Sequence, residues 1–185
     1  GVSVRDPKTD RFYHLKNLSS QNIRCFAETP DGSIWIGTDK GVNRVQLPSV
    51  LPSTNPDLQP VAQVDTFYWD GPMSDQRPSP NVITDLVVGK DGKLWVSSDL
   101  QIGWFDPVQV RFQQVWSEIG AFSTDKKLLP IYLFTGPDGS VWVGHPDRLL
   151  HIQGDRVDDF PLPIRSVFPQ TDVVFDAAGN LFVST

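Results

Sequence analysis

Residues 29–37 read Thr-Pro-Asp-Gly-Ser-Ile-Trp-Ile-Gly, and the same pattern returns three more times along the chain. Each copy has a turn dipeptide, one intervening residue, an aliphatic, an aromatic, a second aliphatic and a small residue. The other copies occupy residues 89–97, 136–144 and 176–184. A motif that recurs at a spacing of tens of residues is typical of proteins built from equivalent structural units. The sequence therefore predicts a modular array.

Each copy of the motif is predicted to be a β-hairpin. Runs rich in β-branched and aromatic residues lie on both sides of the turn, as residues 23–28 and 34–36 do in the first copy. The Asp-Gly dipeptide supplies the positive φ that a tight turn between twisted strands requires. The runs do not alternate apolar and polar residues, so both faces of the hairpin should be buried. The small residue that closes each copy, such as Gly37, indicates close packing there.

Two more strand-like runs follow each hairpin, for example residues 41–45 and 66–69 after the first. We therefore expect a unit of four antiparallel strands, here called a, b, c and d from axis to rim. Four-stranded sheets that stack face to face around an axis form a β-propeller. The predicted fold class is all-β, a β-propeller segment. Trp35, Trp95 and Trp142 share one register in the repeat, and we expect them to lie between adjacent blades.

The order of the strands predicts an open set of blades. The chain begins with strands c and d and stops after strand b, which gives about three full blades and two terminal half-blades. The predicted divisions are half-blades 1–16 and 164–185, full blades of about 17–70, 80–116 and 128–161, and a Pro-rich insertion at 46–62. Half-blades have unpaired edges and apolar faces that seek partners. We expect them to pair with each other, with a second copy, or with the rest of a longer propeller.

Composition and short motifs narrow the function. The chain is 39% hydrophobic and 21% charged, which is ordinary for a globular protein. Its net charge of −6 argues against a surface for nucleic acid or anionic membranes. No His or Cys pair has zinc-ligand spacing, and the Asp-Gly turns lack the alternating oxygen ligands of a calcium loop. The sequence shows no nucleophile elbow and no phosphate-binding glycine loop. We therefore expect no catalytic residue, metal or cofactor.

Residues 30–45, which read Pro-Asp-Gly-Ser-Ile-Trp-Ile-Gly-Thr-Asp-Lys-Gly-Val-Asn-Arg-Val, resemble the two-component regulator propeller repeat. Residues 6–12 resemble the connector between strands c and d in that family. The resemblance covers most of the chain and is strong in the first repeat, fair in the second and third, and weaker in the fourth, which lacks the Asp-Gly and the Trp.

Such repeats form extracytoplasmic sensor regions of bacterial hybrid histidine kinases and of some diguanylate cyclases. The resemblance thus implies a ligand-sensing input module that lies in the periplasmic part of an inner-membrane protein. Family members often sense saccharides.

A binding site is expected on one face of the propeller. The b–c and d–a loops emerge together, at the opposite end from the Asp-Gly turns. They carry carboxylates, amides, arginines and aromatics, which suit a saccharide or small anion. His145 stands where the first repeat has Thr38, beside the expected funnel mouth. The candidate ligand-binding residues are Trp69, Asp75, Arg77, Asp99, His145 and Arg148.

Two other functions remain open at this point. Lyases of the streptogramin-cleaving type share a propeller with similar hairpins, as in residues 136–142. Such an enzyme should place a His and carboxylates together at the axis, usually with a metal, and only His145 fits that position. The third alternative is a scaffold that binds a protein partner.

Overall fold

The computed structural model describes residues 1–48, 62–69, 81–98, 101–107, 109–117, 132–145, 148–154, 156–163 and 173–184. These residues form β-strands and no helix. Three antiparallel sheets have four strands each, with the strands in sequence order across the sheet. The first sheet contains β3 (Ile23–Glu28), β4 (Ile34–Thr38), β5 (Gly41–Gln46) and β6 (Gln63–Phe67). The second contains β7 (Ile83–Val88), β8 (Leu94–Ser98), β9 (Gln101–Asp106) and β10 (Arg111–Ser117). The third contains β11 (Tyr132–Thr135), β12 (Val141–His145), β13 (Arg148–Gln153) and β14 (Arg156–Pro161).

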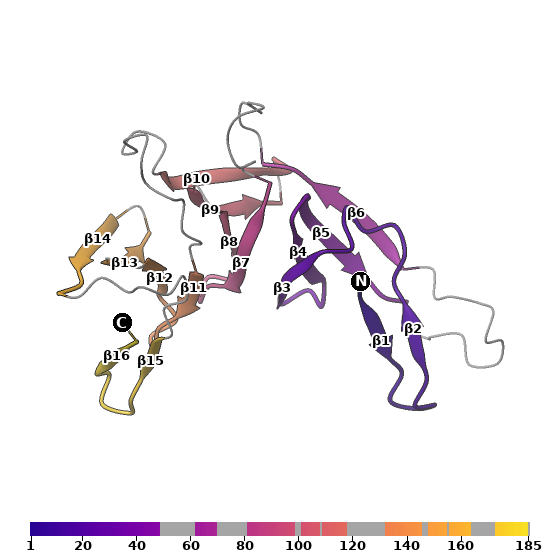
Figure 1. Ribbon diagram of the computed structural model, residues 1–185, viewed down its shortest axis with the longest axis horizontal. Helices are drawn as coiled ribbons and strands as arrows, with labels where there is room; N and C mark the ends of the chain where they lie inside the picture. The colour runs from indigo at the N-terminus through magenta and orange to yellow at the C-terminus, as the bar shows by residue number, and fades with distance from the viewer. Residues whose placement is uncertain are drawn as a thin grey trace.

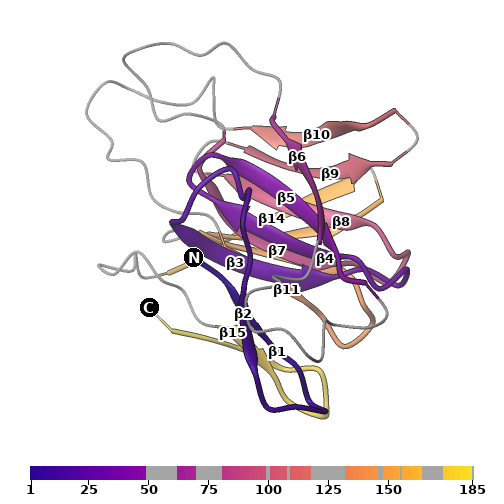
Figure 2. The same ribbon diagram turned by 90° about the vertical axis from the view of Figure 1, so that its right-hand side faces the viewer.

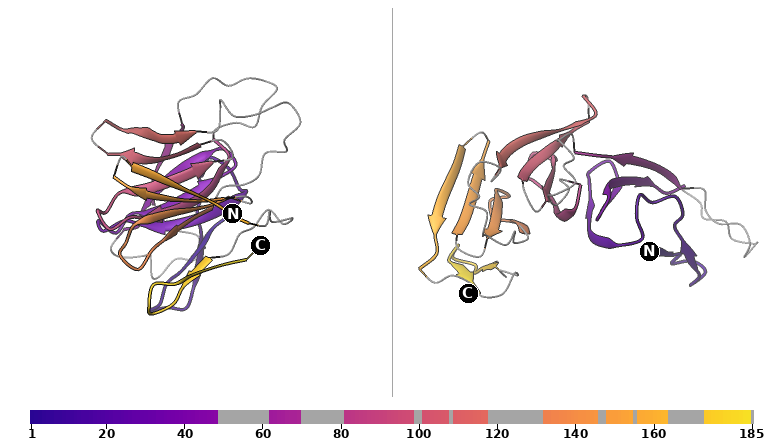
Figure 3. Two further views of the ribbon diagram at one scale, coloured as in Figure 1. Left: turned by 90° about the vertical axis from the view of Figure 1, so that its left-hand side faces the viewer. Right: turned by 45° about the horizontal axis from the view of Figure 1, so that its top comes forward.

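A two-stranded sheet stands at each end of the series. The N-terminal hairpin is β1 (Ser3–Arg5) with β2 (Phe12–His14), and the C-terminal hairpin is β15 (Val173–Phe175) with β16 (Leu181–Val183). Figure 1 shows the five sheets following one another along an arc, with the first strand of each four-stranded sheet on the inside and the last on the outside. The views from the two sides show the sheets stacked behind one another (Figure 2 and the left panel of Figure 3). The predicted fold class is confirmed: the chain is all-β, with four-stranded antiparallel sheets arranged as in a propeller.

The divisions into blades and the Pro-rich insertion stay predictions, and residues 49–61 of that insertion lie outside the described residues. The two terminal hairpins form separate sheets at opposite ends of the arc (Figure 1). Both have exposed apolar side chains: Phe12 is 70% exposed, and the cross-strand partners Val174 and Phe182 are 63% and 57% exposed. Association through these hairpins also stays a prediction.

The sheets are held together by apolar clusters between their faces. Trp35 is 4% exposed in the cluster between the first and second sheets, where its ring centroid lies 5.0 Å from that of Phe105. Trp95 is 5% exposed in the cluster between the second and third sheets. Trp142 is half-buried and lies against Phe175 of the C-terminal hairpin, with ring centroids 5.6 Å apart. The predicted position of these tryptophans between adjacent blades is confirmed, and Trp142 is less covered because its neighbour has only two strands.

The small residues that end each motif copy allow the sheets to approach. A β-carbon on Gly37 would collide with the thiol of Cys25 and with Ile83 of the second sheet. Ser97, the equivalent residue of the second sheet, is fully buried. Burial also raises the pKa of the Cys25 thiol to about 12, so the thiol stays protonated. The close packing expected from the sequence is therefore present between the first and second sheets.

The Asp-Gly turns have the predicted conformation. Gly32, Gly92 and Gly139 have φ angles of 76°, 78° and 77°, a region that L-residues rarely adopt. The aspartate before each glycine accepts a hydrogen bond from the backbone N–H two residues after it. These bonds join Asp31 to Ser33 at 3.1 Å, Asp91 to Lys93 at 3.1 Å and Asp138 to Ser140 at 3.0 Å. Each turn is therefore stabilised by its own side chain.

The Asp31 carboxylate should make the stability of the fold depend on pH in the acidic range. The Thr29 hydroxyl donates to it at 2.6 Å, and this bond is the main reason that its pKa falls from 3.8 to about 2. The Ser33 N–H and hydroxyl and the Arg44 guanidinium add to the shift. Because the folded pKa lies below the unfolded one, the stabilisation is complete above 3.8 and is lost as the pH falls towards 2.

We therefore expect Asp31→Asn to lose less stability than the wild type between pH 3.8 and 2. Urea denaturation at a series of pH values measures this slope. Thr29→Val should also make stability depend less steeply on pH in this range, because that change removes the largest cause of the lowered Asp31 pKa. A slope in Asp31→Asn as steep as in the wild type would show that Asp31 does not carry the effect.

Candidate functional site

The strand ends define two opposite faces of the arc. The turn face carries the Asp-Gly turns around Asp31, Asp91 and Asp138, together with the turns between strands c and d. The loop face carries the b–c connections, which follow β4, β8 and β12. Because consecutive strands are antiparallel, these two sets of connections lie at opposite ends of each sheet. The site predicted from the sequence belongs to the loop face.

Trp69 is a core residue. It is 4% exposed and belongs to the cluster between the first and second sheets. Its ring stacks on Phe112 with centroids 5.0 Å apart, and its backbone N–H donates to the Asn81 side-chain oxygen at 2.6 Å. The indole therefore stabilises the contact between two sheets and has little surface to offer a ligand.

His145 and Arg148 meet at the loop face. His145 ends β12, Arg148 begins β13, and the two are cross-strand partners. The Arg148 guanidinium lies 3.0 Å from the Asp159 carboxylate on β14, and both side chains are partly exposed. Asp75, Arg77 and Asp99 lie outside the described residues, and the side chain of His145 is not described either. A ligand pocket on the loop face therefore stays a prediction. Of its six candidate residues, His145 and Arg148 occupy neighbouring positions in the structure.

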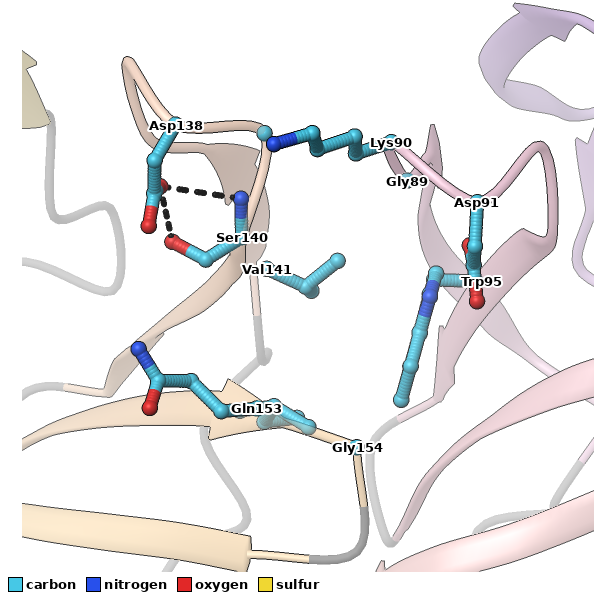
Figure 4. A pocket seen from close by; sticks show the side chains of 11 residues that line it. Gly89, Lys90, Asp91, Trp95, Asp138, Ser140, Val141, Gln153 and Gly154 are labelled. Atoms are coloured by element: carbon cyan, nitrogen blue, oxygen red, sulfur yellow. Dashed lines mark hydrogen bonds between the residues drawn. The ribbon is translucent and has the colours of Figure 1, made fainter.

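The described cavities lie on the turn face, where the sequence indicated only turn chemistry. One cavity of about 370 Å³ opens between the first and second sheets, beside Trp35 and Arg44. A second, also of about 370 Å³, opens between the second and third sheets, beside Trp95 and Lys90 (Figure 4). Sequence reasoning missed both, because each forms between turns that are far apart in the sequence: Asp31 and Asp91 are 60 residues apart, and Asp91 and Asp138 are 47 residues apart. One sequence difference could have drawn attention to the second cavity. Gly89 and Lys93 stand where the first copy has the hydroxyl residues Thr29 and Ser33.

Among the described residues, no group of three or more His, Cys, Asp or Glu side chains is placed to hold a metal ion. Within the same residues, no helix is long and apolar enough to span a membrane.

The fold and its repeat define a class of protein. Stacked four-stranded sheets around an arc, each built on the same hairpin motif, make this chain a segment of a β-propeller. Residues 17–40 match the family described as "Two component regulator propeller". The resemblance drawn from the sequence is thus confirmed: the chain carries a two-component regulator propeller repeat. No curated protein matches the chain by sequence.

Solved structures share the fold over nearly the whole chain. The extracellular domain described as hybrid two component system BT4673 of B. thetaiotaomicron is 16% identical, with a TM-score of 0.68, over 99% of this chain and 22% of that one. The extracellular domain of system BT3049 of the same organism is 17% identical, with a TM-score of 0.66, over 99% of this chain and 23% of that one. This chain therefore spans less than a quarter of the length of these proteins.

An enzyme of similar fold is also among the solved structures. Virginiamycin B lyase of Staphylococcus aureus is 15% identical, with a TM-score of 0.60, over 94% of this chain and 52% of that one. At these identities the likenesses establish the fold and leave the function open.

Proposed function

We propose that this chain is a ligand-sensing propeller domain in the extracytoplasmic part of a bacterial signal-transduction protein. The observation that carries the proposal is the two-component regulator propeller repeat at residues 17–40. The shared fold with extracellular domains of two component systems, over 99% of this chain, supports it. In this account the segment is an input module without catalytic residues, and a histidine kinase or diguanylate cyclase elsewhere in the protein would supply the output.

The ligand of this sensor is proposed to bind at the loop face. His145 and Arg148 are adjacent there, and Asp75, Arg77 and Asp99 are proposed to join them from the neighbouring d–a and b–c connections. Carboxylates and guanidinium groups form strong charge-assisted hydrogen bonds with hydroxyl groups and anions. We therefore propose a saccharide or a small anion as the ligand class.

The test is a calorimetric titration of the chain with a panel of neutral oligosaccharides and small anions. If the proposal is right, one of them binds, and Arg77→Ala weakens its binding about tenfold or more, because a hydrogen bond to a charged group is lost. Arg156→Ala is the matched control, since this arginine begins β14 at the turn face and bonds to Asp158. Equal affinity in the wild type and Arg77→Ala would contradict the loop-face site.

A lyase activity is the second candidate, and the fold it shares with virginiamycin B lyase favours it. The same purified chain should be incubated with a streptogramin B, with product formation followed by mass spectrometry. We expect no cleavage. Cleavage that His145→Ala abolishes would replace the sensor proposal by the lyase.

A further inference from the structure

The cavity between the second and third sheets is lined by residues from both sheets. The second sheet provides the Asp91 turn and Trp95, and the third sheet provides the Asp138 turn and the c–d turn at Gln153 (Figure 4). The Lys90 backbone N–H donates to the Gly139 carbonyl at 3.1 Å, which joins the two turns. The Lys90 side chain extends across the opening towards the Asp138 turn (Figure 4). The cavity is therefore a defined space that exists only where two sheets meet.

The Trp95 indole N–H is the unusual group in this cavity. Trp95 is 5% exposed, yet its N–H has no hydrogen-bond partner among the described residues. In the first sheet the equivalent Trp35 N–H donates to the Thr29 hydroxyl at 3.0 Å, and in the third sheet the Trp142 N–H donates to the Ser140 hydroxyl at 3.1 Å. The Trp95 indole lines the cavity, and its N–H is therefore a donor that a molecule in the cavity can use.

The reason for the missing partner is a local difference in sequence. The second sheet has Gly89 where the first has Thr29, and Lys93 where the third has Ser140, so neither position carries a hydroxyl. A β-carbon on Gly89 would lie 3.0 Å from the Trp95 indole nitrogen. Gly89 therefore supplies no side-chain hydroxyl to the indole, and the same β-carbon would also lie 3.0 Å from an Asp91 carboxylate oxygen.

The other polar groups of the cavity are also available. The Lys90 ammonium has no ion pair and the Gln153 amide has no hydrogen bond within the described part of the chain. The Ser140 N–H and hydroxyl both bond to one Asp138 oxygen, at 3.0 and 2.6 Å, which leaves the second oxygen without a hydrogen-bond donor among the described residues. The cavity thus presents donors from Trp95, Lys90 and Gln153, and acceptors from Asp138 and Gln153.

The cavity between the first and second sheets provides an internal comparison. Its volume is also about 370 Å³, and it too is bounded by Asp-Gly turns and a tryptophan. There, however, the Trp35 N–H is bonded to Thr29, Arg44 is paired with Asp31 at 2.6 Å, and Lys93 is paired with Asp91 at 3.0 Å. Its polar groups are satisfied by the protein itself, so the open groups of the other cavity do not follow from the repeat.

From this contrast we propose that the cavity between the second and third sheets is a binding site for a small, neutral, polyhydroxylated molecule, to which the Trp95 indole N–H donates. The charged residues that line it are Lys90, Asp91 and Asp138. Asp91 is already paired with Lys93, which lies outside this cavity, at 3.0 Å, so Lys90 and Asp138 balance each other and neither an anion nor a cation is selected. Hydroxyl groups both donate and accept, which matches the mixture of free donors and acceptors. The volume of about 370 Å³ is that of a site for a small ligand.

This site is separate from the loop-face site and does not depend on the proposed sensing function. The experiment observes the six tryptophan indole N–H signals by ¹H–¹⁵N NMR during titration with glucose, maltose and myo-inositol, and with phosphate and glucuronate as anions. The Trp95 signal is assigned by its absence in Trp95→Phe. We expect a neutral polyol to shift this signal in a saturable manner.

Gly89→Thr restores the hydroxyl that Thr29 supplies beside Trp35 and should weaken that binding about tenfold or more, because the indole donor is then occupied. Trp35→Phe, in the satisfied cavity, should leave the affinity within about twofold, since it lies at the other cavity. If Gly89→Thr does not fold, the exposed change Lys90→Ala serves in its place, with binding about threefold to tenfold weaker.

Several results would overturn the proposal. They are no polyol shifting the Trp95 signal, an anion binding more tightly than every polyol, or a Trp35 signal moving instead. Unchanged binding in the folded Gly89→Thr variant would do the same. Arg77→Ala should not change the effect of the polyol on the Trp95 signal. The experiment therefore distinguishes failure of the loop-face site from failure of this site.

Discussion

Replacing Trp95 by alanine is expected to lower the free energy of unfolding by about 3–5 kcal/mol. The side chain is 5% exposed and packs in the cluster with Leu133, Val141 and Ile152, so its loss leaves a cavity between the second and third sheets. Urea denaturation followed by circular dichroism measures the change. Because a domain of this size is typically stable by about 5–15 kcal/mol, a substantial unfolded fraction is expected on mild heating.

Two matched variants separate packing from other effects of the change at Trp95. Trp95→Phe keeps an aromatic ring in the cluster and should cost clearly less than alanine. Trp142→Ala should also cost less, since Trp142 is half-buried against a two-stranded hairpin. An unaltered melting temperature in Trp95→Ala would show that the sheets do not depend on the packing described here.

Gly103→Ala is expected to destabilise the protein by about 3 kcal/mol or more, through overpacking. A β-carbon at this position would collide with the backbone carbonyl of Gln113 on β10 and would lie 3.0 Å from the Trp69 ring. A backbone atom cannot move aside without disturbing the pairing of β9 with β10. Thermal and urea denaturation measure the loss.

The control for this glycine lies directly across the strand pair. Gln114 is the cross-strand partner of Gly103 and has an exposed side chain, so Gln114→Ala should change stability by less than about 0.5 kcal/mol. A Gly103→Ala protein as stable as Gln114→Ala would mean that β9 and β10 are not packed as closely as described.

The fold could be predicted from the sequence because its signals are local and repeated. The Asp-Gly turns at Asp31, Asp91 and Asp138 fix the hairpins, and the apolar runs beside them require both faces of each sheet to be covered. The small residue after each hairpin marked the close approach that Gly37 makes to Ile83. Each motif copy alone is a weak indication of structure, but four copies in one register predict the propeller fold.

The contacts between sheets could not be predicted, because they join residues that no local pattern relates. The Asp85 carboxylate on β7 accepts a hydrogen bond from the Leu133 N–H on β11 at 3.0 Å, and burial raises its pKa. The buried Asn43 side chain similarly holds Ser19, 24 residues away, with its oxygen accepting from the Ser19 N–H at 2.9 Å. Such pairs depend on how the sheets and loops are placed, which a single sequence does not give.

The candidate site was the part least accessible to sequence reasoning. Trp69 is expected at the loop face because it ends a strand d and precedes a d–a loop, yet its ring is buried between sheets, and no local signal separates these two outcomes. The turn-face cavities were missed since the turns look alike in every copy. Only the exchange of the hydroxyl residues Thr29 and Ser33 for Gly89 and Lys93 distinguishes the cavity with an unpaired donor from the one without.

The central claim is that this propeller segment binds a small molecule and acts as an input domain. Hydrogen–deuterium exchange of the chain, with and without the tightest ligand of the titration panel at saturation, tests it most directly. We predict slower exchange confined to the proposed loop-face site, in peptides covering residues 69–77, 99–101 and 145–148, or to the turn-face residues 89–95, 138–140 and 152–154. Exchange that no panel member changes in either set of peptides would contradict the claim.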